Sequence, residues 1–104
     1  MNEKTNSVTL IGRVGYNPTL TKLEGGKMQV RFSLATFDTE KDQSGQIVET
    51  TTWHEIISDI KENFDVKKGD KIQVDGKLNN ISYLTRKGEK RYVTVVNAIE
   101  ITKK

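Results

Sequence analysis

The chain alternates apolar and polar residues with a period of two over much of its length. The alternation is strict over residues 28–34, and within residues 8–14 the apolar positions Val8, Leu10 and Val14 share one face. Successive side chains of a β-strand point to opposite faces, so these apolar positions are expected to line a core. The pattern predicts a strand in each of the two segments.

Residues 50–57 and 71–78 are the third and fourth predicted strands. The earlier segment is rich in β-branched and aromatic residues, which favour strands. In the later one the apolar residues, Leu78 included, are expected to point into the core. Gly76 is expected to mark a bend or a bulge.

A fifth strand is predicted over residues 91–101, preceded by a short additional strand over 81–85. The turn between them, residues 86–90, contains Gly88, which suits a positive φ angle. Polar, glycine-containing or proline-containing stretches predict loops over residues 15–18, 23–27 and 38–47.

One short helix is predicted between the third and fourth strands. Asp59 and Glu62 have the spacing of a capping box, with Asp in place of Ser or Thr. Ile60 and Phe64 fall one helical turn apart, and Gly69 is a suitable stop.

These elements predict an all-β protein: a five-stranded Greek-key barrel of the OB type with one short helix between strands three and four. An SH3-like barrel is the main alternative, but it does not usually place a helix at that position. The length of 104 residues fits one domain, spanning residues 1–104. OB barrels commonly bind oligonucleotides or oligosaccharides.

The composition limits which cofactors and partners the chain is expected to have. The chain has no cysteine and one histidine, so it can form neither a disulfide nor a thiolate metal site. The net charge of +3 is a mild indication of a polyanionic partner. Residues 1–7 are polar and lack an apolar signal core, and no run is long enough to span a bilayer. We therefore expect a cytoplasmic protein without a metal or other cofactor.

Several short motifs occur in one order along the chain. They are Asn6–Gly15 followed by Asn17-Pro18, Phe32–Thr36, Thr52–His54, Lys67–Asp70, Val74–Leu78 and Arg91–Thr94. Together, from Asn6 to about Asn97, they resemble the bacterial and mitochondrial single-stranded DNA-binding protein family. The resemblance implies an OB fold, and protection of single-stranded DNA in replication, recombination and repair without sequence readout. It also implies a homotetramer or dimer, replication and repair partners, and nucleoid-associated work.

Binding of this kind needs exposed aromatic rings that stack on bases and cations that follow the phosphates. Trp53 and Tyr83 match stacking tryptophans of the family, and Phe37 stands near another aromatic position. For Trp53 the alternation alone also permits a core position. Tyr92 alternates with valines and is expected to be structural.

Six cations are candidate phosphate contacts. Two are strand residues that point away from the inferred core, Arg13 and Arg31. The other four lie on or next to the turn after Tyr83: Arg86, Lys87, Lys90 and Arg91. A solvated face and a solvated turn would also be basic, so the rings and the charges have to be considered together.

The resemblance assigns His54 to a subunit interface, because the matching histidine of the family lies there. No spaced cluster of acids accompanies it, so we expect neither catalysis nor metal binding. Two alternatives stay open: a replication-restart accessory that acts mainly through protein contacts, and a small nuclease on the same fold, which would need clustered acids.

The sequence departs from the family in three ways. Bacterial members usually continue into a long tail with an acidic end, whereas this sequence reaches a basic segment, Ile101–Lys104. The predicted helix region is shorter by about one turn. Where the family often places aromatics after the second strand and at the end of the third, this chain has Asp38–Lys41 and Ser58-Asp59. The affinity for DNA or the size of its binding site is therefore expected to differ.

Overall fold

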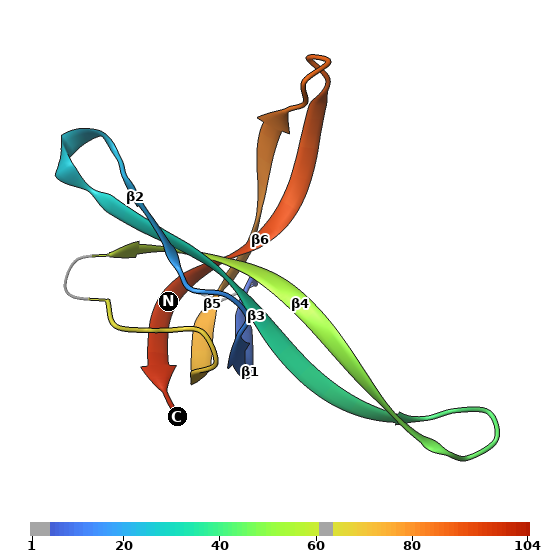
Figure 1. Ribbon diagram of the computed structural model, residues 1–104. Coiled ribbons are helices and arrows are strands. Elements are labelled where there is room, and N and C mark those ends of the chain that lie inside the picture. The colour runs from blue at the N-terminus through green and yellow to red at the C-terminus, as the bar shows by residue number, and fades with distance from the viewer. Residues whose placement is uncertain (1–4, 61–63) are drawn as a thin grey trace.

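Six strands and one short 3-10 helix make up the computed structural model, which describes residues 5–60 and 64–104 (Figure 1). In chain order they are β1 (Val8–Val14), β2 (Thr19–Lys22), η1 (Glu24–Gly26), β3 (Met28–Lys41), β4 (Ile47–Ile60), β5 (Lys71–Leu84) and β6 (Lys90–Lys103).

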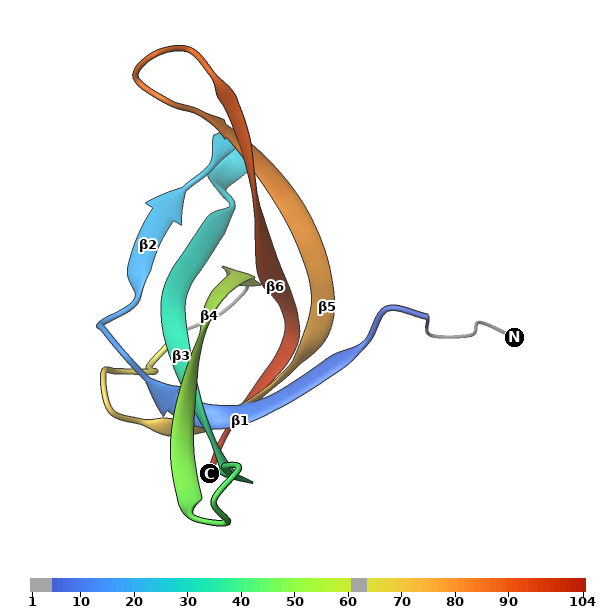
Figure 2. The ribbon, with the colours of Figure 1, turned by 90° about the vertical axis from the view of Figure 1, so that its right-hand side faces the viewer.

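The strands form one sheet that closes on itself. Its order is β1-β5-β6-β4-β3-β2, and β1 also pairs with β3, so five strands close into a barrel and β2 extends its β3 edge. All pairings are antiparallel except β4 with β6. In Figure 2, β1 crosses the lower end of the barrel between β3 and β5. The predicted OB-type barrel is confirmed.

The core follows the alternation of the sequence. Val30, Phe32 and Leu34 of β3 are fully buried, and the same cluster includes Ile56 of β4 and Val14 of β1. Burying such side chains contributes about 1.5–3 kcal/mol each, which is the main stabilising contribution available to a barrel of this size.

Barrel closure depends on a close approach at Gly12. A Cβ added there would overlap the backbone carbonyl of Ala35 on β3. The next residue pair, Arg13 with Ala35, is where β1 joins β3. Glycine at this position therefore permits the contact that converts the sheet into a barrel.

Two long hairpins project from the barrel in different directions (Figure 1). The radius of gyration is 16.2 Å, whereas a compact chain of this length would have about 13 Å. The predicted loop over 38–47 is wrong at both ends, because strand pairing continues from Asp38 with Thr50 to Lys41 with Ile47. Only residues 42–46 form the turn, since antiparallel pairing satisfies the backbone groups of the flanking residues.

The helix predicted between the third and fourth strands is absent over residues 64–70. Asp59 and Ile60 belong to β4, Glu62 lies outside the described residues, and residues 64–70 contain no helix. Phe64 instead packs its ring against Phe32, with centroids 6.2 Å apart. A helix this short is marginal in water, and here the apolar side chains reach the core from an irregular segment instead.

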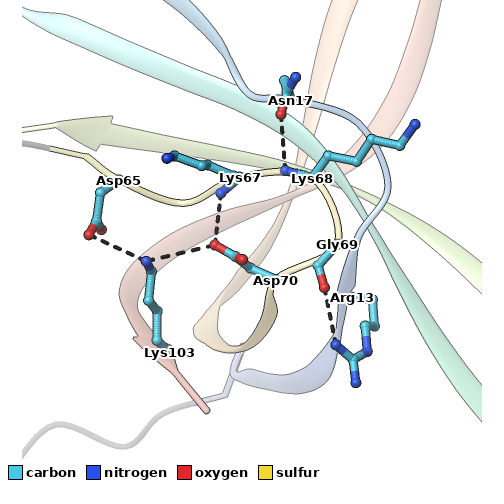
Figure 3. A network of polar contacts seen from close by, with 8 residues as sticks. All are labelled: Arg13, Asn17, Asp65, Lys67, Lys68, Gly69, Asp70 and Lys103. Atoms are coloured by element: carbon cyan, nitrogen blue, oxygen red, sulfur yellow. Dashed lines mark hydrogen bonds and ion pairs between the residues drawn. The ribbon is translucent and has the colours of Figure 1, made fainter.

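Side chains hold residues 65–70 in place (Figure 3). The backbone N–H of Lys67 donates to the Asp70 carboxylate at 2.9 Å, and that of Lys68 donates to Asn17 Oδ1 at 3.1 Å. Lys103 of β6 forms ion pairs with Asp65 and Asp70 at 3.3 and 3.7 Å. These contacts replace helical hydrogen bonds and fix the turn beside the end of β1.

The bulge predicted at Gly76 is confirmed by a shift in the β5–β6 register between Asp75 and Gly76. Leu78 pairs with the buried Val96 and therefore points to the core side, as predicted, but its side chain is 50% exposed. Leu78 lies where β5 leaves the barrel to form the second hairpin, which leaves half of its side chain outside the core. In the described ranges, no helix is long and apolar enough to span a bilayer.

Candidate nucleic-acid interface

The strand register places several predicted residues on the side of the sheet opposite the core, called here the outer face. Ala35 pairs with Arg13 on one side and with Trp53 on the other. Residues opposite each other in paired strands share a face, so the arginine and the indole flank Ala35. Phe37 lies two residues further along β3 and shares this face.

Trp53 is 62% exposed, which excludes the core position that the alternation had left open. Its ring lies against the backbone of Gly15, where an added Cβ would overlap both the indole and the Ser33 hydroxyl. The Gly15 N–H donates to the carbonyl of Ser33 at 2.9 Å and holds the chain under the ring. The indole therefore has one supported side and a large solvent-facing surface.

Phe37 is also 62% exposed and belongs to the part of β3 that extends beyond the barrel. It pairs with Thr51 on β4, next to the pair formed by Ala35 and Trp53 on the same face. Diagonal neighbours of this kind lie about 7–8 Å apart, so the two exposed rings are close neighbours.

Arg31 is engaged within the chain. Its Nε donates to Oε1 of Glu55 in an ion pair, and the Tyr16 hydroxyl donates to the same oxygen at 3.3 Å. Burial, and then the negative charge of Glu55, raises the pKa of Tyr16 above its ordinary value, so the phenol stays protonated. Glu55 is the next residue after Trp53 on the same face of β4, so the cluster begins beside the indole.

Arg13 is held at the other side of the face. Its Nη1 donates to the carbonyl of Gly69 at 3.1 Å, in the turn fixed by Asn17 and Asp70 (Figure 3). Within residues 5–60 and 64–104, no carboxylate forms an ion pair with Arg13. Arg13 therefore contributes a cation at a defined place, in the same row as Ala35 and Trp53.

The second hairpin carries Tyr83, which is 53% exposed. Tyr83 pairs with Arg91, and β6 pairs in parallel with β4 through Ile57 and Asn97. Between the bulge and the hairpin tip, the odd-numbered side chains of β5 and β6 therefore share the face of the odd-numbered side chains of β4. Tyr83 and Arg91 lie on the same face as Trp53, although on a different projection of the sheet.

The remaining predicted cations surround the tip of this hairpin. Arg86, Lys87 and Lys90 are all exposed, and Arg91 forms an ion pair with Glu89 at 2.9 Å. Lys90 lies over the ring of Tyr92, 5.6 Å from its centroid. Tyr92 is 67% exposed, so the structural role expected for it is wrong. The valines that suggested a core position lie nearer the barrel.

His54 lies on the opposite face of β4 from Trp53. It points to the core side of β4, is half-buried, and its Nε2 is 2.9 Å from Oγ1 of Thr36. A depression of about 360 Å³ beside it is lined by residues of β1, β3 and β4. The depression lies where β1 diverges from β3, and exposed Ile11 is part of its wall.

Sequence reasoning missed the contributions of Tyr16 and Glu55. A signal was present for both, because Tyr16 follows Gly15 in a turn and Glu55 is two residues after Trp53 on the same side of a strand. Only the pairing of β3 with β4 shows that they meet at Arg31. Among residues 5–60 and 64–104 there is no group of three or more potential metal ligands.

A closed five-stranded barrel with exposed rings and cations on one face defines the OB class of oligonucleotide-binding folds. The model of the Single-strand binding protein family matches residues 5–103. The chain belongs to this family.

Individual relatives agree with that assignment. The chain is 35% identical to single-stranded DNA-binding protein 1 of Xylella fastidiosa over 102 residues, covering 92% of this chain and 74% of that protein. It is also 35% identical to the mitochondrial single-stranded DNA-binding protein of Oryctolagus cuniculus over 108 residues, covering 92% and 72%.

Two solved structures have the same fold. One is the Plasmodium falciparum SSB complex with ssDNA, with a TM-score of 0.84 at 28% identity, covering 100% of this chain and 99% of that one. The other is a deletion mutant of the single-stranded DNA binding protein from Thermus aquaticus, with a TM-score of 0.83 at 28% identity, covering 95% of this chain and 50% of that one.

Proposed function

We propose that this chain binds and protects single-stranded DNA, without reading its sequence, during replication, recombination and repair. Membership of the single-strand binding family and the likeness to a complex with ssDNA support the proposal. The observation that carries it is the indole of Trp53, which is exposed, supported by Gly15 and aligned with Arg13 across Ala35. Any base can stack on such a ring, because every base has a π-face.

In the proposed mechanism, bases stack on Trp53, Phe37 and Tyr83 while Arg13, Arg31, Arg86, Lys87, Lys90 and Arg91 contact phosphates. Each stacked base contributes about 1–3 kcal/mol. Phosphate contacts release counterions, which makes the affinity fall with rising salt. This is binding rather than catalysis, and we place it in the cytoplasm, at the nucleoid.

We also propose that the chain works as a homotetramer or dimer with His54 at an interface. Large apolar side chains are exposed on the isolated chain, among them Ile99 at 78% and Ile11 at 49%. Contiguous apolar surface on a soluble chain commonly marks a site of association. Sedimentation of the wild type and of His54→Ala over a range of protein concentrations tests this; identical association constants would contradict a place for His54 at the interface.

The sole tryptophan gives a direct test of DNA binding. Titration with oligo-dT should quench the fluorescence of Trp53, and the midpoint should move to higher oligonucleotide concentration as salt is raised. Trp53→Phe should keep most of the affinity, while Trp53→Ala should lose about 1–3 kcal/mol, measured by the anisotropy of labelled oligo-dT. Unchanged fluorescence together with unchanged anisotropy at low salt would contradict the proposed function.

A further inference from the structure

Glu55 puts a negative charge in the middle of a surface that is proposed to receive phosphates. It lies two residues after Trp53 on the same face of β4, and its side chain is 28% exposed. Its Oε1 accepts hydrogen bonds from Arg31 Nε and from the Tyr16 hydroxyl. A carboxylate at this place opposes the binding of a polyanion.

The geometry of the cluster indicates how Glu55 acts on Arg31. Arg31 and Glu55 occupy adjacent rows of the β3–β4 ladder, because Arg31 pairs with Ile57 and Ser33 with Glu55. Their contact is a diagonal one on an exposed face, and the arginine side chain is 46% exposed. An ion pair this accessible is weak, so a phosphate that arrives with a stacked base can replace the carboxylate.

Two effects of Glu55 then act in the same direction. In the free protein it neutralises Arg31, which lowers the positive potential beside Trp53. In the complex the displaced carboxylate stays near a phosphate and repels it. Tyr16 steadies the carboxylate, because its hydroxyl donates to the oxygen that Arg31 also uses.

We propose, resting on the proposed function, that Glu55 limits the affinity for single-stranded DNA by occupying Arg31, which exchanges this carboxylate for a phosphate when the strand binds. Glu55 is thus a residue that sets affinity and salt dependence. A protein that must be displaced from a strand benefits from such a limit, since weaker contacts shorten the residence time.

The test compares Glu55→Gln with Glu49→Gln by anisotropy titration of labelled oligo-dT at several salt concentrations. The amide of Glu55→Gln can still accept the two hydrogen bonds but does not neutralise Arg31. Glu49 is a matched control, because it lies on the same strand and the same face and the change removes the same charge. We expect Glu55→Gln to bind about two- to fivefold more tightly at low salt, which is the equilibrium equivalent of an exposed ion pair.

The salt dependence and a double mutant identify the mechanism. Glu55→Gln should steepen the slope of log affinity against log salt by about 0.7, because Arg31 then neutralises a phosphate without freeing a carboxylate. Glu49→Gln should change the affinity by less than about twofold. In an Arg31→Gln background, Glu55→Gln should produce no larger effect than Glu49→Gln, because no cation is then released.

The possible failures are distinguishable. If Glu55→Gln binds equally or more weakly, or if the gain persists without Arg31, the proposal is wrong. If the wild type fails to bind oligo-dT at low salt, the proposed function itself is wrong.

Spectrophotometric titration of the tyrosines checks the contact in solution: Glu55→Gln should lower the pKa of one phenol, because a charge that raises the pKa of Tyr16 has been removed. An unchanged titration would also overturn the proposal.

Discussion

The two projecting hairpins have closely matching turns. In the turns 42–46 and 85–89, the N–H of the first residue donates to the carbonyl of the fifth at 2.9 Å. In both, the N–H of the glycine at the fourth position donates to the carbonyl of the first residue, at 3.0 and 2.9 Å. The glycines, Gly45 and Gly88, have φ angles of 85° and 81°. The same turn geometry therefore occurs in both hairpins.

The two hairpins nevertheless have opposite charge. Residues 38–50, around the β3–β4 turn, carry four acids and one lysine: Asp38, Glu40, Asp42, Glu49 and Lys41. Residues 81–93, around the β5–β6 turn, carry four cations and one acid: Arg86, Lys87, Lys90, Arg91 and Glu89. All ten of these side chains are exposed. The comparison shows that backbone geometry and binding chemistry are specified separately here.

If the strand follows positive potential, it leaves Trp53 toward the β5–β6 hairpin and avoids the tip of the β3–β4 hairpin. Four experiments test this difference between the two hairpins.

Neutralising the basic hairpin should have the largest effect. Replacing Arg86, Lys87, Lys90 and Arg91 by Gln should weaken oligo-dT binding about a hundredfold at low salt and reduce the salt slope by about 0.7 for each phosphate that is no longer neutralised. The matched control replaces the four acids of residues 38–50 by their amides and should not weaken binding. An equal loss of affinity from both sets, measured by anisotropy, would show that the strand follows both hairpins.

The two tyrosines of the basic hairpin lie on opposite faces. Tyr83 pairs with Arg91 on the face of Trp53, whereas Tyr92 pairs with Ser82 on the other face. Tyr83→Ala should therefore cost about 1–3 kcal/mol of binding free energy, the value of one stacked base. Tyr92→Ala, in the same titration, should cost clearly less. The reverse order would place the strand on the wrong face in the proposed mechanism.

The glycines of the two turns separate stability from binding. Because each has a positive φ, Gly45→Ala and Gly88→Ala should each cost about 1–2 kcal/mol of folding free energy. Both should lower Tm by several degrees in thermal unfolding followed by circular dichroism. Only Gly88→Ala should also weaken oligo-dT binding, because it displaces the cations of the tip. A weaker affinity for Gly45→Ala alone would contradict the assignment.

The smallest effect concerns acid pH. Hydrogen bonds, first from the Ser44 hydroxyl and then from the backbone of Gln46, lower the pKa of Asp42 below its ordinary value of 3.8. A lowered pKa stabilises the turn above pH 3.8, and this contribution is lost as the pH falls through the folded-state pKa. Amide exchange at Ser44 and Gln46 should therefore accelerate in acid relative to Glu89, whose N–H is held by the Thr85 hydroxyl. Equal acceleration in both turns would show that Asp42 is not the cause.

Much of the barrel could be predicted from the sequence, because its information is local. Alternation over residues 28–34 correctly predicted which side chains of β3 are buried, and Gly76 marked the bulge. Two of the failures share one cause. The hairpin beyond Asp38 and the exposure of Leu78 depend on where the barrel ends, and no local pattern encodes that boundary.

The candidate site divides in the same way. The sequence shows which residue types the site can use: a single tryptophan, a tyrosine before a basic turn, and arginines on the polar side of strands. The folded chain is needed to show that Trp53 is exposed on Gly15, that Arg31 is held by Glu55, and that Tyr92 is exposed. The physical reason is that strand periodicity fixes on which side of a strand a side chain lies, while pairing between distant strands fixes its neighbours.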